Sequence, residues 1–180
     1  MRKLTAFLAM LFLLAAGASA VADSYTSSDL GFSADFPGTP TVGAPQGSEK
    51  DSAGNFISTL VYVNFARQGV YVAAVVEDHY DVPGAIDVPG TLTTERDNFL
   101  KAFHVERTSE HDDVVSGHPA NFFTFDSDGH RAQGQGVVIV IDTPRPRIFI
   151  VATTYTPAAS ADDRAALDKF FASFKLLPGW

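Results

Sequence analysis

The sequence predicts an α+β protein with a single antiparallel sheet of about six strands, covered by helices. Two observations predict this class. Segments rich in Val, Ile, Phe and Thr read as strands on both sides of one amphipathic helix, and a second amphipathic helix lies near the end of the chain. Because the strands come in runs and do not alternate with helices, an antiparallel sheet is favoured over a parallel one.

The first half of the chain contains the best-defined hairpin. Residues 31–36 read as a short strand, and the Gly-, Pro- and Ser-rich residues 37–55 read as a loop with room for a brief strand. Residues 56–65 and 70–79 then form the hairpin, joined by the loop 66–69. Both faces of this strand pair are apolar, so both are expected to be covered.

A helix is predicted at residues 91–104, because apolar side chains recur on one of its faces. These side chains are Leu92, Phe99, Leu100 and Phe103. Thr91 or Thr93 is expected to cap the helix. Before it, the motif Asp-Val-Pro-Gly occurs at 81–84 and again at 87–90, which predicts a structured turn that excludes regular helix.

The second helix is predicted at residues 160–175. Ser160 followed by Asp163 resembles a capping box. Apolar side chains at helical spacing then form one stripe, consisting of Leu167, Phe170, Phe171 and Phe174. Such a stripe indicates a helix that packs on the sheet, not an aromatic binding surface.

The segment between the two helices is predicted to supply most of the remaining strands. Residues 105–110 read as a strand and residues 110–113 as an acidic turn. Residues 137–141 are continuously apolar and β-branched, which is typical of a buried central strand. Residues 147–155 alternate as a further strand.

The stretch "GHPANFFTFDSDGHR" (117–131) is interpreted as a hairpin with its turn at Asp128-Gly129. That turn places Asp126 opposite Arg131 as a cross-strand ion pair, and it gathers the phenylalanines on an apolar face. His118 and His130 then lie at opposite ends of the hairpin, so they are not expected to share a metal ion.

Residues 1–20 are predicted to be a cleavable signal peptide, with Arg2 and Lys3 before an apolar run and small residues before a cleavage site at Ala20 or Ala22. Residues 21–30 are then a flexible lead-in and residues 31–180 a single globular domain. The chain has no cysteine, which excludes a lipid-anchored lipoprotein and disulfides. The protein is expected to be periplasmic or secreted, with no integral membrane span after cleavage.

Charge and motifs exclude several functions. The formal net charge is −8, and it becomes two units more negative when Arg2 and Lys3 leave with the signal peptide. Such a chain repels nucleic acid, so no nucleic-acid partner is expected. Neither a Gly-x-Ser-x-Gly motif nor a phosphate-binding glycine loop occurs. The protein is therefore expected not to be an enzyme and to carry no cofactor.

Two groups of residues remain as site candidates. Carboxylates gather around one histidine in the predicted acidic turn, where they could hold a divalent metal ion. The members of this group are Glu110, His111, Asp112 and Asp113. Arg145 and Arg147 are conspicuous on an acidic molecule and could bind an acidic partner, although pairing of Arg147 with Asp142 across the hairpin is favoured.

Four motifs together resemble the PsbP-like superfamily, an α/β/α sandwich. They are "GFSADFPGTP" (31–40), "GHPANFF" (117–123), "RIFIVATTY" (147–155) and "FFASFKL" (170–176). The matching residues read as structural, and the resemblance carries over no catalytic apparatus. Because the better-known members bind other proteins, it implies an exported, non-enzymatic accessory domain whose partner is a protein of the cell envelope. The alternative is a protein that binds a small apolar ligand or a divalent metal ion.

Overall fold

The structure, a computed structural model, describes residues 23–47, 52–54, 57–79, 86–142 and 146–179. Its main sheet is antiparallel and has eight strands. In chain order these are β3 (Thr41–Val42), β4 (Gln46–Gly47), β5 (Ser58–Arg67), β6 (Val70–His79), β7 (Glu106–Val115), β8 (His118–Asp126), β9 (Gln133–Ile141) and β10 (Arg147–Tyr155). In space the order is β3-β5-β6-β10-β9-β8-β7, and β4 also pairs with β5.

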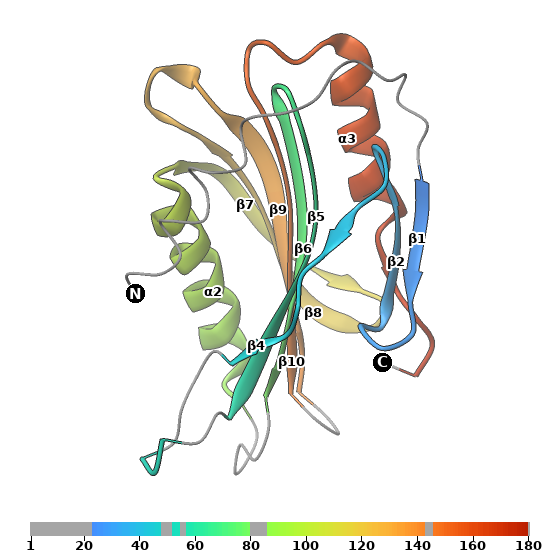
Figure 1. Cartoon of the computed structure of the whole chain (residues 1–180). Coiled ribbons are helices and arrows are strands. Elements are labelled where there is room, and N and C mark those ends of the chain that lie inside the picture. The colour runs from blue at the N-terminus through green and yellow to red at the C-terminus, as the bar shows by residue number, and fades with distance from the viewer. Residues whose placement is uncertain (1–22, 48–51, 55–56, 80–85, 143–145, 180) are drawn as a thin grey trace.

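A smaller sheet and two helices complete the fold. The sheet has the order β1-β2-β11 and is built from β1 (Asp23–Ser27), β2 (Phe32–Phe36) and β11 (Lys175–Leu176). The helices are α2 (Val88–Phe103) and α3 (Ala161–Ser173). Figure 1 shows three layers, with α2 on one face of the main sheet and α3, beside the small sheet, on the other. The α+β class is confirmed.

The prediction of one six-stranded sheet was too simple. The strand predicted at 31–36 is β2, but it pairs with β1 and β11 and does not join the main sheet. β1 forms within the lead-in predicted at 21–30, and β3 and β4 form within the loop predicted at 37–55. All three are short and largely polar, so no apolar pattern in the sequence marks them.

Two aromatic-rich cores lie on the two faces of the main sheet. Phe36, Phe149 and Phe170 are fully buried between the main sheet, the small sheet and α3. On the opposite face, Phe99 of α2 packs on the ring of Phe123 at 5.5 Å between centroids. Phenylalanine thus joins all three layers, because its large apolar ring buries much surface for one side chain.

The β5–β6 hairpin has a tighter turn than the sequence predicts. Arg67 pairs with Val70 across a turn that contains Gly69 at a φ of +81°. The pairing is therefore shifted by two residues from the predicted register. Because side chains alternate with a period of two, this shift leaves each residue on its predicted face.

Helix α2 begins earlier than predicted, inside the second Asp-Val-Pro-Gly motif. The carboxylate of Asp87 accepts a hydrogen bond of 3.2 Å from the backbone N–H of Gly90, so Asp87 is the N-cap, not Thr91 or Thr93. Pro89 lies in the first turn, where its missing N–H would have had no helical partner. A Pro-Gly pair is thus compatible with a helix start as well as with a turn.

Strand β7 continues through the residues predicted to form an acidic turn. It extends to Val115, and the turn to β8 is formed by Ser116 and Gly117, both with positive φ. This conformation matches the right-handed twist of the two strands that it joins. The prediction of a turn at residues 110–113 was wrong, because pairing with β8 outweighs the weak strand preference of acidic residues.

The β8–β9 connection is longer than a two-residue turn. A single helical turn, η1 (Asp128–His130), lies between the strands, and Asp126 pairs with Gln133 rather than with Arg131. The predicted faces again hold, because the shift is two residues. On the apolar face, Gly134 and Gly136 leave space for the rings of Phe125 and Phe123, which a β-carbon at either glycine would strike.

Tyr71 of β6 lies in a desolvated position. Burial, and after it the neighbouring Tyr62, raises the pKa of Tyr71 to about 12. An unfolded tyrosine loses its proton near pH 10, so above that pH the unfolded chain releases a proton that the folded chain retains, and stability falls. We expect the wild type to lose about 2 kcal/mol more than Tyr71→Phe between pH 9 and pH 12 in urea titrations. Equal losses would contradict this assignment.

Candidate functional site

Strand β7 forms one edge of the main sheet. Among the residues that the structure describes, only β8 pairs with it. Nine of its ten residues are exposed, from Glu106 to Val114. Since only one side of the strand is bonded to a neighbour, part of its backbone N–H and C=O groups face outward.

The four candidate metal ligands lie on β7, and the strand separates them. Glu110 and Asp112 point to the α2 face of the sheet, whereas His111 and Asp113 point to the α3 face, because successive side chains alternate. Within the described ranges, no three His, Asp or Glu side chains converge on a position that could hold a metal ion.

Each of the four has another role. Glu110 pairs with Arg96 of α2 and with Arg107 of β7. The Asp112 carboxylate accepts a hydrogen bond of 2.7 Å from the amide of the buried Asn121. The Asp113 carboxylate accepts from the Val114 backbone N–H at 2.8 Å.

His111 is held by an aromatic contact. Its ring stacks on that of Phe122, with centroids 5.1 Å apart and planes 7° apart. Phe122 also packs edge-on against Phe171 of α3. This contact explains why an apolar residue occupies the polar face of the β8–β9 hairpin.

The structure describes one of the two arginine candidates. Arg145 lies outside the described residues. Arg147 is 5% exposed and pairs with Asp78, directly opposite it in the β6–β10 register, with Nη2 2.8 Å from Oδ2. The predicted pairing with Asp142 was wrong, because the strand register places Ile141 and Asp78 on the two sides of Arg147.

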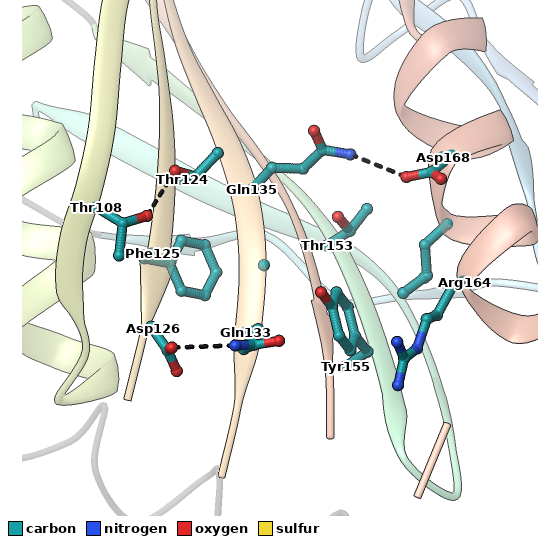
Figure 2. Close-up of a pocket in the computed structure, with 12 residues that line it drawn as sticks. Thr108, Thr124, Phe125, Asp126, Gln133, Gln135, Thr153, Tyr155, Arg164 and Asp168 are labelled. Carbon is teal, nitrogen blue, oxygen red and sulfur yellow. Dashed lines mark hydrogen bonds between the residues drawn. The ribbon is translucent and has the colours of Figure 1, made fainter. Parts of the chain in front are cut away.

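A groove lies between the exposed end of β8–β10 and helix α3 (Figure 2). Its volume is about 430 Å³. The strands supply Thr108, Thr124, Phe125, Asp126, Gln133, Gly134, Gln135, Thr153 and Tyr155, and α3 supplies Arg164, Leu167 and Asp168. Most of the lining residues are polar, unlike those of the apolar pocket considered from the sequence.

Hydrogen bonds connect the polar side chains of the groove. The hydroxyl of Thr124 lies 2.6 Å from that of Thr108 and 2.7 Å from that of Ser109 on β7. The Gln135 amide donates across the groove to the Asp168 carboxylate of α3 at 3.5 Å. The polar side chains of the groove are therefore hydrogen-bonded directly to the edge strand β7.

Asp126 is the most constrained carboxylate of the groove. Its Oδ2 accepts from the Gln133 amide at 3.0 Å and contacts the ring of His130. The hydrogen bond from Gln133 is the main cause that holds the pKa of Asp126 below its ordinary value; desolvation opposes it, and the hydrogen bond and charge of His130 add to the lowering. Its other oxygen, Oδ1, is buried and accepts no hydrogen bond from the described residues.

Arg164 lies across the ring of Tyr155, with the guanidinium carbon 4.8 Å from the ring centroid. No oxygen of the described residues accepts a hydrogen bond from this guanidinium, in contrast to Arg67, which pairs with Asp163. Asp126 and Arg164 thus give the groove one unused acceptor and one unused donor.

The sequence contained a partial signal for this groove. The predicted hairpin places Thr124, Asp126, Gln133 and Gln135 on the face opposite the phenylalanines, and this face is polar. The signal could not show that α3 lies beside that face, because the packing of a helix from residues 161–173 is a long-range property. Thr153 and Tyr155 likewise read as part of a core strand.

None of the helices in the described part of the chain is both long and apolar enough to span a bilayer. The chain matches no family model and no curated protein sequence. Its architecture, however, is found in solved structures. Cyanobacterial PsbP (CyanoP) from Synechocystis sp. PCC 6803 superposes with a TM-score of 0.53 over 92% of this chain and 98% of that chain, at 9% sequence identity.

This protein has a PsbP-like fold. A second similar structure is LpqN, a protein involved in cell envelope biogenesis of Mycobacterium tuberculosis, with a TM-score of 0.51 over 87% of this chain and 90% of that chain, also at 9% identity. The resemblance predicted from the sequence is confirmed for the fold. Its motifs contribute core residues as expected, since Phe36, Phe149 and Phe170 are all fully buried.

Proposed function

We propose that this protein is a non-enzymatic accessory domain of the cell envelope, and that it binds an extended segment of another protein along the edge of β7. The location is supported by the predicted signal peptide and by the structural similarity to LpqN and cyanobacterial PsbP. The observation that carries the binding proposal is the exposure of β7, a strand that is paired on one side only.

An extended segment fits this edge because of backbone hydrogen bonding. In an antiparallel pair, alternate residues bond to the neighbouring strand, and the residues between them direct N–H and C=O outward. A segment from a partner can bond to these outward groups and extend the sheet by one strand. The register shift at Thr108 confines such regular pairing to residues 109–115.

The opposite edge of the main sheet is protected in a different way. There β5 is paired with β3 and β4, which have only two residues each. Very short edge strands offer little backbone to another chain, whereas β7 has ten residues. This difference between the two edges of the main sheet favours β7 as the edge that a partner segment would use.

The side chains of β7 indicate the chemistry of the segment. Arg96 and Arg107 neutralise Glu110, but Asp112 and Asp113 have no cationic partner among the described residues. Val114 is 59% exposed and offers an apolar contact. We therefore expect a partner segment with basic and apolar residues, and we expect like charges to disfavour pairing with a second copy.

The proposal predicts a site-specific crosslink in intact cells. The photo-crosslinker p-benzoylphenylalanine replaces His111, where its first ring can retain the stacking on Phe122. We expect mass spectrometry to identify a second protein attached at position 111. The same group at Asp162, exposed at the start of α3, is the control and should give no such product.

Two neighbouring proline substitutions test the backbone bonding. In Asp113→Pro the missing N–H belongs to the β7–β8 pairing with Ala120, whereas in Val114→Pro, opposite Pro119, it faces outward. Asp113→Pro should lose about 2 kcal/mol of stability, since the carbonyl of the buried Ala120 loses its donor. Val114→Pro should keep the wild-type Tm but give several-fold less crosslink at position 111. If the stable variant crosslinks in full yield, or if the product is a homodimer, the proposal is wrong.

A further inference from the structure

We propose that the groove between β8–β10 and α3 binds a neutral saccharide. This site is separate from residues 109–115, the outward edge of β7 that the proposed function uses, although the groove reaches Thr108 of the same strand. The volume of about 430 Å³ falls within the range of small-molecule sites, about 300–1,000 Å³. The argument for a saccharide comes from the donors, the charges and the apolar surfaces of the groove.

The hydrogen-bonding groups fit a ligand that donates and accepts at the same positions. A hydroxyl group does both. Oδ1 of Asp126 is a buried acceptor without a donor, and the guanidinium of Arg164 is a donor without an acceptor among the described residues. The Gln135–Asp168 contact of 3.5 Å is long enough to be replaced by ligand hydroxyls bonded to both side chains.

The charges of the groove favour a neutral ligand. Its lining holds two carboxylates, Asp126 and Asp168, and one guanidinium, Arg164. Figure 2 shows Asp126 on the strand side and Asp168 on α3, so the two carboxylates do not converge on one cation. A phosphate or an acidic sugar would meet two like charges, and a cationic ligand would meet Arg164.

Apolar surface is present for the carbon-bound faces of a sugar ring. Phe125 and Leu167 line the groove but are only 3% and 1% exposed, so the partly exposed ring of Tyr155 supplies the apolar face that a sugar can contact. Arg164 over the Tyr155 ring fixes both groups at one end of the groove. A carboxylate, amides, an arginine and the ring of Tyr155 together provide the mixed polar and apolar lining that a saccharide requires.

The test uses the folded protein and a panel of neutral saccharides. The panel contains mono- to tetrasaccharides of glucose, mannose, galactose, arabinose and N-acetylglucosamine, and saturation-transfer NMR followed by titration measures binding. We expect at least one saccharide to bind with a Kd of about 1 mM or tighter. Asp126→Asn and Gln135→Ala should each weaken that binding at least about tenfold, since each removes a hydrogen bond to the ligand.

Matched substitutions outside the groove are the controls. Asp162→Asn and Gln46→Ala make the same chemical changes at exposed positions on α3 and β4 and should bind as the wild type. Vesicles that display the same sugar on a lipid identify the source: if they bind as well as the soluble sugar, a glycolipid head group is accepted too. The proposal is overturned if no saccharide of the panel binds tighter than 10 mM, or if folded groove variants bind like the wild type. That result would leave the β7 proposal intact.

Discussion

Phe149→Ala should lower the free energy of unfolding by about 3–5 kcal/mol, measured by urea denaturation. Phe149 lies on β10 near the middle of the main sheet and is fully buried. Its ring contacts Phe32 of the small sheet at 6.3 Å and Phe174, just after α3, at 6.2 Å between centroids. Truncation would leave a cavity where the main sheet meets the small sheet and the end of α3.

Phe171→Ala is the matched control. This ring packs on the margin of the same core but remains partly exposed, so its truncation opens less of a cavity. We expect it to cost less than half as much as Phe149→Ala. Equal losses would show that the cross-layer contact of Phe149 does not determine the stability of the fold. Near-ultraviolet circular dichroism of both variants would confirm native packing before the comparison is made.

Patterns that depend on local sequence were predictive for this fold. The capping box of α3 forms as expected, with Ser160 and Asp163 bonded to each other's backbone N–H groups. Leu167 and Phe170 from the predicted stripe are fully buried or nearly so. Strand faces were also correct in both hairpins, because alternation along a strand is read directly from the sequence.

The pairing registers of the strands and the boundaries of the strands were less predictable. Both hairpins are shifted by two residues from the prediction, and a shift of two preserves the faces on which the prediction depended. The acidic residues at 110–113 have a weak strand preference, and only β8, which follows them in the chain, supplies the pairing that makes them a strand. The apolar pattern carries no information about either point.

The candidate site was the least predictable part of the molecule. Local clustering in the sequence suggested Glu110, His111, Asp112 and Asp113, but neighbours in a strand point to opposite faces. The groove instead combines residues separated by up to 60 positions, from Thr108 to Asp168. Such a combination follows from how α3 packs on the sheet, which no short motif encodes.

Arg147→Met should be among the most destabilising substitutions in the chain, with a loss of about 3–5 kcal/mol. It removes the cation from a pair in which the Arg147 side chain is 6% exposed and that of Asp78 is 19% exposed. The carboxylate of Asp78 would remain largely buried without its charge partner. The guanidinium also lies 3.5 Å from the carbonyl oxygen of Asp29, so its loss loosens the connection between the main sheet and the β1–β2 loop.

A double-mutant cycle separates the ion pair from simple packing. Asp78→Leu alone should also destabilise, because it removes the carboxylate that accepts two hydrogen bonds from the buried Arg147 guanidinium. In the double variant neither charge remains, so we expect its loss to be smaller than the sum of the single losses by at least about 2 kcal/mol. Strictly additive losses would mean that the two side chains contribute independently. A stability role of this size explains why an arginine that stood out in the sequence as a docking residue is instead buried in the sheet.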